Sequence, residues 1–372
     1  MIFKSLGTVS FRNLADTSVD TGGKDVFLVG KNGQGKTNFL EALYFSAYAS
    51  SFRGVRDAEL ARTGEKDFSV VAALSSGEDG KILAKCQGGK KTVLVNGKRV
   101  EDRKDLLSVI PCIVFCHEDM EFVAGSPERR RWFFDQCLSL CDPLYLDDLR
   151  RFRRVLKARN TFLKDHAPAH AGITKDDSTL DVLDIQFVQY GMKLIAEREK
   201  AAAAFSGIFG PLYEEVSGIA GVTVHYQPSW KGGRAEKTIA WLGQRRENDR
   251  IAGTSLSGPH RDRYSFVRGG ADFSEKASTG QRRLLALLLR IAQARRFSEM
   301  AGKNPVLLLD DVLLEMDGEK RRKFISVMPE YDQAFFTFLP EEPYSLYRKP
   351  NTMVYTVEDG SVMVESVLAG RS

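Results

Sequence analysis

The chain has 372 residues, a formal net charge of +5, 43% hydrophobic residues and 28% charged residues. This length exceeds what one hydrophobic core usually holds, so we expect two domains, or one domain with a large insertion. The composition is that of an ordinary soluble globular protein and excludes a disordered chain. No apolar run is long enough to span a membrane, and the N-terminus alternates like a strand, so we expect a cytoplasmic protein.

The five cysteines predict reduced thiols with no disulfide framework. Four of them form two C-x3-C pairs, Cys112/Cys116 and Cys137/Cys141. Zinc sites usually contain C-x2-C pairs, so the pattern favours structural cysteines. A site in which all four bind one metal ion is the alternative.

The first hundred residues are rich in strand patterns. Alternating or continuous apolar runs predict strands at 3–12, 25–30, 69–74, 81–86 and 91–100. Asn96-Gly97 is a strong hairpin signal between two parts of the last run. Helical spacing of apolar residues predicts a helix over 38–50.

Long helices are predicted from 126 onwards. Ser126-Pro127 begins the first as cap and first-turn proline, and amphipathic stretches follow at 144–166 and 179–209. The last two would pair as an antiparallel helical arm. A strand at 222–230 and a helix at 235–250 lead back to an α/β pattern. We therefore predict an N-terminal α/β segment (1–125), an inserted, mainly helical arm (126–250) and a C-terminal α/β segment (251–372). The two α/β segments would form one discontinuous domain, called the head below.

The sequence GKNGQGKT, Gly30 to Thr37, follows a buried strand and opens a helix, as a phosphate loop requires. Its glycines let backbone N–H groups converge on a phosphate, and the helix N-terminus adds positive potential. Lys36 is expected to reach the β- and γ-phosphates, and Thr37 to ligate Mg²⁺. The nucleotide-binding residues predicted here are Gly30, Lys31, Asn32, Gly33, Gln34, Gly35, Lys36 and Thr37.

The sequence PVLLLDD places Asp310 and Asp311 at the end of an aliphatic run typical of a central parallel strand. The two carboxylates are then expected beside the phosphate loop. Asp310 would hold Mg²⁺, and Asp311 would orient or deprotonate the attacking water, with Lys36 as the other catalytic residue. A helix cap or a solvated loop is the alternative. Two carboxylates beside one phosphate loop make ATP hydrolysis the economical explanation.

Five segments share an order and spacing with a known family. They are GKNGQGKTNFLEALYFSAYASSFR, HEDMEFVAGSPERRRWFFD, GPHRD, ASTGQRRLLALLLRIAQ and PVLLLDDVLLEMD. Together they resemble the RecF family of bacterial recombination mediators, essentially from end to end. The resemblance implies an α/β, ABC-type P-loop ATPase head like that of SMC proteins, with a mixed sheet, an antiparallel β subdomain and an inserted helical arm.

The resemblance also places a signature motif at STGQ, residues 278–281. It implies that Ser278, Gly280 and Gln281 contact ATP held by the phosphate loop of a second subunit, so that ATP drives homodimer formation. A hydroxyl and a glycine at a helix start suit an anion, although a plain helix cap is the alternative. Thr279 stands where transporters usually have glycine.

Other positions follow from the same resemblance. His117-Glu118-Asp119 stands at the loop that couples the nucleotide to the inserted domain, and 314–317 at a loop across the dimer interface, with Asp317 as its polar contact. Thr337 is the nearest substitute for the switch histidine of transporters. Asp311 replaces the glutamate of faster ATPases, so we expect slow hydrolysis. The segment GPHRD, 258–262, has no role that we derive from sequence.

Cations along the predicted arm suit sequence-independent phosphate contacts, although a solvated helix face is the alternative. They are Arg129, Arg130, Arg131, Arg150, Arg151, Arg153, Arg154, Lys157 and Arg159. Arg150, Arg151, Arg154 and Lys157 are the arm residues that we expect to bind DNA. Arg53 and Arg56 are the candidates in the head, followed by Arg62 and Arg12; Arg12 could instead contact the nucleotide.

The resemblance implies an ATP-dependent mediator that binds double-stranded DNA beside single-stranded gaps. With RecO and RecR, it would help to load RecA onto DNA coated by single-strand-binding protein, in gap repair, replication restart and the SOS response. Two alternatives remain: an SMC-like structural chromosome ATPase, which should have a far longer coiled coil, and the nucleotide-binding subunit of a transporter, which should have a switch histidine and no basic arm. A small-molecule kinase would not explain STGQ.

Overall fold

The structure is a computed structural model that describes residues 1–75, 79–166, 177–231, 233–313, 316 and 318–365. The chain divides into two compact units, Met1–Asp119 with Phe297–Ser372, and Met120–Arg296. The first unit is therefore discontinuous in sequence, and the second is inserted between its parts. Each unit is described by itself.

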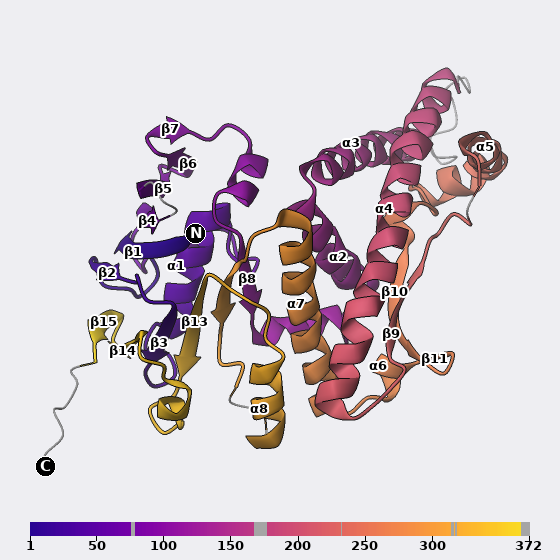
Figure 1. Cartoon of the computed structure of the whole chain (residues 1–372). Helices are drawn as coiled ribbons and strands as arrows, with labels where there is room; N and C mark the ends of the chain where they lie inside the picture. The colour runs from indigo at the N-terminus through magenta and orange to yellow at the C-terminus, as the bar shows by residue number, and fades with distance from the viewer. Residues whose placement is uncertain (76–78, 167–176, 232, 314–315, 317, 366–372) are drawn as a thin grey trace, which may run out of the picture. The chain divides into compact units, whose positions relative to one another are not determined.

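The first unit contains a six-stranded sheet of order β15-β14-β3-β13-β12-β8 (Figure 1). Its strands are β3 (Asp25–Val29), β8 (Cys112–Phe115), β12 (Val306–Leu309), β13 (Gln333–Phe338), β14 (Thr352–Glu358) and β15 (Ser361–Val364). All neighbouring pairs are parallel except β14 with β15. Strands β3 and β12 are buried along their whole length, which explains their continuous apolar sequences. The loops after β3, β12 and β13 leave the same edge of this sheet.

The second sheet of this unit is antiparallel, with order β2-β1-β4-β5-β6-β7. Its strands are β1 (Ile2–Val9), β2 (Ser18–Asp20), β4 (Phe68–Ser75), β5 (Asp79–Gln87), β6 (Lys90–Val95) and β7 (Lys98–Arg99). Asn96 and Gly97 both have positive φ, at 51° and 78°, so the expected hairpin turn is present. The predicted α/β class, with a mixed sheet and an antiparallel β subdomain, is confirmed.

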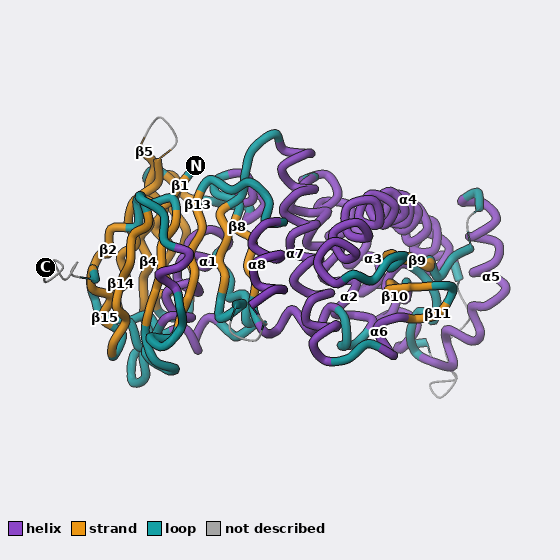
Figure 2. The backbone as a smooth tube through the Cα atoms, turned by 60° about the horizontal axis from the view of Figure 1, so that its bottom comes forward, coloured by secondary structure: helices purple, strands orange, loops and turns teal. Residues whose placement is uncertain are grey.

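Helix α1 (Lys36–Tyr48) packs in the core that the two sheets share (Figure 2). Phe39, Leu43 and Phe45 are buried there, together with side chains from both sheets. This packing fixes the helix whose first residues follow the phosphate loop. The remaining short elements are η1 (Asp57–Leu60), η2 (Arg103–Ser108), η3 (His117–Phe122), α8 (Gly318–Ser326) and η6 (Tyr344–Tyr347).

The second unit is mainly helical. Its helices are α2 (Pro127–Cys141), α3 (Pro143–Asp165), α4 (Ser178–Ser217), α5 (Ala235–Ala252), α6 (Phe273–Lys276) and most of α7 (Thr279–Ala301). The ring of Phe152 stacks on that of Phe187 at 5.2 Å, and Arg159 pairs with Asp184. Helices α3 and α4 therefore lie side by side and run in opposite directions, as the predicted antiparallel arm requires.

The C-terminal boundary of this unit differs from the predicted one at residue 250. Strand β10 (Arg263–Arg268) pairs antiparallel with β9 (Thr223–Gln227), and β11 (Ala271–Asp272) completes the three-stranded sheet. This pairing keeps residues 251–296, including the signature motif, with the helical unit and not with the head. Sequence periodicity does not show which strand a later strand joins, so the boundary was placed too early.

The segment GPHRD carries the central buried contacts of the second unit. The carboxylate of Asp262 accepts hydrogen bonds from Arg198 at 2.7 Å and from the backbone N–H of Ser229 at 2.8 Å. Arg198, which is 2% exposed, also forms a bidentate pair with Asp135. Burial lowers the pKa of His260 to about 4. The segment, for which sequence gave no role, is thus a structural junction between helices and sheet.

The cysteines are free thiols. Cys112 and Cys116 lie in the first unit, whereas Cys137 and Cys141 lie in the second. Burial raises the pKa values of Cys112 and Cys137. Within the described ranges, no group of three or more His, Cys, Asp or Glu side chains is placed to hold a metal ion. The same part of the chain contains no helix both long and apolar enough to cross a membrane.

Candidate nucleotide site

The phosphate loop connects β3 to α1, as its sequence context predicts. Gly33 and Gly35 have φ values of 80° and 117°, in the left-handed region that glycine tolerates. A Cβ on Gly30 would lie 2.3 Å from the carbonyl oxygen of Val357, so only glycine fits there. Helix α1 begins with no side-chain cap and no acidic residue in its first turn, which leaves its N–H groups and dipole available to an anion.

Two side chains of the loop are held by hydrogen bonds. Lys36 is 4% exposed, and its Nζ donates to the carbonyl oxygens of Gly30 at 2.6 Å and Lys31 at 3.1 Å. The side chain of Gln34 accepts through Oε1 from the backbone N–H of Asp359 at 2.6 Å, and its backbone carbonyl oxygen accepts from that of Gly360 at 2.9 Å. The turn between β14 and β15 therefore braces the loop. Lys31, Asn32 and Gly33 are exposed.

The two aspartates lie at the end of β12, beside the loop. The hydroxyl of Thr37 donates to Oδ1 of Asp310 at 2.8 Å. A hydroxyl and a carboxylate at this separation are ligands that Mg²⁺ prefers, so these residues fit the ion that the sequence implies. The alternative of a solvated loop for Asp310 and Asp311 is not what the structure shows, since both are half-buried at the sheet edge.

Thr337, at the end of β13, connects the two carboxylates. Its hydroxyl accepts from the backbone N–H of Asp311 at 2.7 Å and lies 2.8 Å from Oδ1 of Asp311 and 3.3 Å from Oδ1 of Asp310. Strand β13 lies between β3 and β12, which places Thr337 there. Asp311 has a positive φ of 50°, which aspartate tolerates better than most residues. Thr337 therefore fixes the orientation of Asp311.

The Asp310 carboxyl has a raised pKa. Burial, followed by the charge of Asp311, raises the pKa of Asp310 from 3.8 to about 6. We expect a carboxyl titration near pH 6 in ¹³C-aspartate NMR of the nucleotide-free protein. Asp311→Asn should shift this midpoint downward, because it removes a negative charge that disfavours ionisation of Asp310. Asp310→Asn should abolish the titration; a midpoint near 4 in the unchanged protein would contradict the assignment.

A buried glutamate on α1 was missed in the sequence. Glu41 is fully buried, and its carboxylate pairs with Arg12 at 2.9 Å and Arg53 at 3.7 Å. Arg53 also donates to the side chain of Asn38 at 3.1 Å. The signal for this cluster is the lone acidic residue in the apolar run NFLEALYF. Both arginines, proposed above as DNA or nucleotide contacts, thus brace α1 close behind the phosphate loop.

The signature residues lie in the second unit. Ser278, Thr279 and Gly280 are exposed at the start of α7. The backbone N–H of Ser278 donates to Oε1 of Gln281 at 2.8 Å, and that of Gln281 donates to the Ser278 hydroxyl oxygen at 3.3 Å. This reciprocal pair is a capping box, so the helix-cap alternative describes the local geometry. Among the described residues, the Ser278 hydroxyl accepts this bond and donates none.

Several cations counted for the predicted basic arm are used within the protein. Arg159 is fully buried and pairs with Asp184 and Asp249, both at 2.7 Å. Arg130 and Arg131 donate to the carbonyl oxygens of Tyr264 and Asp262. Arg159 is therefore no surface cation, whereas Arg130 and Arg131 are half-buried and use part of their donors inside the unit. Sequence spacing does not reveal such internal partners.

Of the arm cations predicted from sequence, those that are exposed are Arg129, Arg151, Arg153, Arg154 and Lys157. Arg150 is half-buried and, like Arg151, lies 3.8 Å from an aspartate one turn earlier. In the first unit Arg56 is exposed, and Arg62 is paired with Asp16. The predicted DNA contacts on α3 and those in the head therefore belong to different units.

The remaining predicted positions fall around β8 and β12. His117 and Glu118 are exposed in η3, and Asp119 is buried, accepting a hydrogen bond from the backbone N–H of Cys116 at 3.0 Å. Glu118 is close enough to Asp310 to raise its pKa slightly. Residues 314, 315 and 317 of the predicted interface loop, Asp317 included, lie outside the described residues.

A phosphate loop after one parallel strand, paired acids after another and an inserted helical unit together define an ATPase head of the ABC and SMC type. The sequence profile described as the RecF/RecN/SMC N terminal domain matches residues 2–361. The chain belongs to the RecF family of DNA replication and repair proteins. It is 43% identical over 357 residues to the DNA replication and repair protein RecF of Treponema pallidum, covering 95% of this chain and 98% of the relative.

Other relatives and solved structures agree with this assignment. The DNA replication and repair protein RecF of Staphylococcus epidermidis is 30% identical over 374 residues, covering 98% of this chain and all of the relative. A structure of the recombination mediator RecF with ATP, from the RecFOR pathway, superposes with a TM-score of 0.87 at 26% identity, covering 98% and 97% of the two chains. An SMC head bound to the C-terminal winged-helix domain of ScpA, at 16% identity and a TM-score of 0.55, shares the fold over 98% and 96% of the chains.

Proposed function

We propose that this chain is an ATP-dependent, DNA-binding recombination mediator of the cytoplasm that dimerises when it binds ATP. It would bind double-stranded DNA next to single-stranded gaps on the nucleoid. With RecO and RecR, it would help RecA to replace single-strand-binding protein in gap repair, replication restart and SOS induction after DNA damage. The hydrogen bond between Thr37 and Asp310, which joins the phosphate loop to the acidic strand, is the observation that carries the ATPase part.

ATP hydrolysis follows from the chemistry at the sheet edge. The phosphate loop and Lys36 would bind the phosphates, and Thr37 with Asp310 would hold Mg²⁺, which neutralises phosphate charge. Asp311 would accept the proton of the attacking water, and Thr337 keeps its carboxylate in one orientation. The shorter reach of aspartate compared with glutamate supports slow hydrolysis, which would time dimer and DNA release.

Dimerisation is supported by the exposure of the signature residues. Ser278, Thr279 and Gly280 stand at the start of a long helix, with the hydroxyl and backbone N–H groups at its positive end. Hydroxyl and N–H groups at the start of a helix bind anions. We propose that the anion here is the γ-phosphate of ATP bound to the phosphate loop of a second subunit. The relative whose structure was solved with ATP is itself called a recombination mediator, which supports the assignment of ATP as the ligand.

The test of this proposal is the molar mass by light scattering with and without ATP and gapped DNA. The 41.5 kDa chain should double in mass with ATP. Lys36→Ala should stay monomeric because it does not hold the phosphates, and Ser278→Ala should bind ATP but dimerise weakly. Ser326→Ala, an exposed serine on α8, serves as the matched control. A monomeric ATP-bound wild type, or unaltered dimerisation of Ser278→Ala, would reject the proposal.

A further inference from the structure

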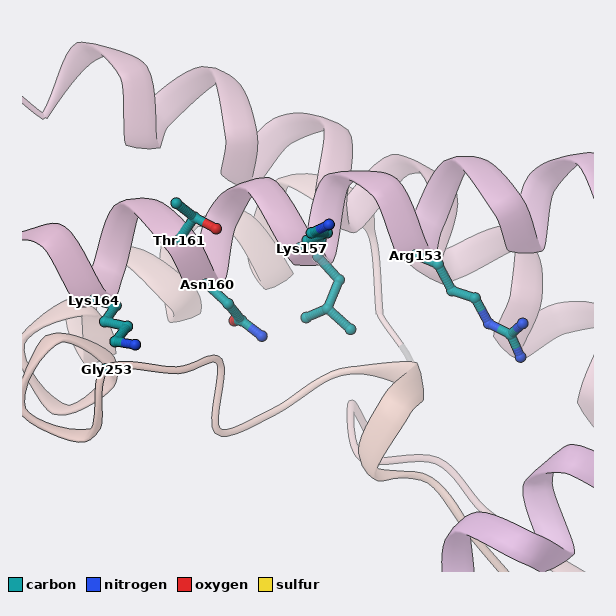
Figure 3. A pocket seen from close by; sticks show the side chains of 7 residues that line it. Arg153, Lys157, Asn160, Thr161, Lys164 and Gly253 are labelled. Atoms are coloured by element: carbon teal, nitrogen blue, oxygen red, sulfur yellow. The ribbon is translucent and has the colours of Figure 1, made fainter. Parts of the chain in front are cut away.

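A pocket lies along α3, next to the end of α5. Its volume is about 410 Å³. In Figure 3 the side chains of Arg153, Asn160 and Lys164 project from one side of α3, and Gly253 lies beside Lys164. Leu156 and Thr161 complete the lining together with Lys157. We call this feature the α3 groove; six of its seven lining residues come from one helix.

The charges of the α3 groove have one sign. Arg153, Lys157 and Lys164 are exposed, and no acidic residue lines the pocket. Among the residues that the structure describes, Lys157 and Lys164 have no carboxylate within 4 Å, and Arg153 has only Asp135, at 3.6 Å. That carboxylate is already engaged by the buried Arg198. The groove therefore holds cationic charge that the protein itself does not neutralise.

Asn160, an uncharged residue of the groove, also offers a hydrogen-bond donor. Oδ1 of Asn160 accepts hydrogen bonds from the backbone N–H of Ser255 at 2.8 Å and from its hydroxyl at 2.7 Å. The Ser255 hydroxyl in turn accepts from the buried Arg159 at 2.7 Å. These bonds fix which end of the amide faces the interior, so the NH₂ group of Asn160 faces the groove. An interior network thus holds a hydrogen-bond donor in place among three cations.

Donors of this kind match a phosphodiester backbone. Phosphate oxygens are acceptors only, and Arg, Lys and Asn side chains are their usual partners. The groove is shallow and extends along the helix, from Arg153 to Lys164, over about 16 Å at the α-helical rise. That length corresponds to roughly five nucleotides along one strand of B-DNA. A carboxylate-rich peptide could share the charge complementarity, but it would not need donors in such an extended line.

We infer that the α3 groove binds the phosphate backbone of DNA through Arg153, Lys157, Asn160 and Lys164. The inference rests on the proposed DNA-binding function and changes the set of arm residues expected to contact DNA. Arg151, predicted above as a contact, lies elsewhere on the circumference of α3 because it is two residues from Arg153, or about 200° around the helix. Arg151 therefore does not belong to the groove, whereas Asn160 and Lys164 do.

Binding of a fluorescent DNA duplex in the presence of ATP, measured over a range of salt concentrations, tests the inference. Each lost phosphate contact should reduce the slope of log affinity against log salt by about 0.9. The double variant Lys157→Gln/Lys164→Gln should therefore reduce the magnitude of this slope by about two. It should also weaken DNA binding roughly tenfold or more at physiological salt. Asn160→Asp keeps the acceptor for Ser255 but places a negative charge in the groove, so it should also weaken binding. Lys200→Gln, an exposed lysine on α4 outside the groove, is the matched control.

The outcomes separate the groove from the wider function. If the wild type does not bind duplex DNA, the proposed function and the inference both fall. If it binds, but the groove variants keep its affinity and salt slope, only the inference is overturned. If these variants keep DNA binding but lose binding to a poly-glutamate peptide, the groove receives an acidic protein instead. Unchanged thermal unfolding of each variant confirms that a loss of affinity is local.

Discussion

Asp311→Asn should abolish nearly all ATP hydrolysis while leaving ATP binding intact. The amide cannot accept the proton of the attacking water, and loss of a general base costs on the order of 10²–10⁴-fold in rate. Asparagine keeps Oδ1 for the Thr337 hydroxyl and tolerates the φ of 50° at this position. Lys36, Thr37 and Asp310 are unchanged, so the affinity for ATP should stay within a few-fold of the wild type.

Single-turnover phosphate release, measured beside fluorescent-nucleotide binding, separates these effects. The variant should bind nucleotide and form a longer-lived ATP dimer. Asp311→Ala is the comparison that loses both the base and the Thr337 contact, and it should also perturb the backbone. If Asp311→Asn hydrolyses ATP within about threefold of the wild-type rate, another group activates the water. A threefold loss is far smaller than the loss expected when a general base is removed.

Arg198→Met should destabilise the second unit by about 3–5 kcal/mol, because it leaves two buried carboxylates without their cation. Arg198 bonds both Asp135 and Asp262, which are 5% and 0% exposed. All three tryptophans, Trp132, Trp230 and Trp241, lie in this unit, so their fluorescence follows its unfolding in urea within the full chain. The midpoint should fall strongly.

Lys200→Met is the control for that experiment. Lys200 lies two residues further along α4, and its side chain is 72% exposed with only a local pair to Glu197. Its loss should change the free energy of unfolding by less than about 0.5 kcal/mol. If Arg198→Met unfolds at the same urea concentration as this control, the buried cluster around GPHRD is not what holds the unit together.

The nucleotide site was largely predictable from sequence because its parts carry local signals. The phosphate loop is recognised from its glycines between a strand and a helix, and Asp310 and Asp311 from the aliphatic run before them. The role of Thr337 was harder to predict. Its contact with both carboxylates depends on β13 lying between β3 and β12, and strand order is a long-range property that no short pattern records.

The helical unit was less predictable, because charge alone does not distinguish a surface cation from a buried one. Arg153 and Arg159 belong to the same basic run, yet one faces solvent and the other is fully buried between two aspartates. The acids that pair with Arg159 lie far away in sequence, on α4 and α5. The pairing of β10 with β9 places residues 251–296 in this unit. It was also not predictable, because the two strands are far apart in sequence.

The central claim is that each ATP-binding site combines the phosphate loop of one subunit with the signature motif of another. Mixing two inactive variants tests it most directly: Lys36→Ala, which lacks a working phosphate loop, and Ser278→Arg, which lacks a working signature. A mixed dimer contains one site with an intact loop and an intact signature, so ATP hydrolysis, absent from either variant alone, should return. If the mixture stays as inactive as its components, the two motifs do not act across subunits.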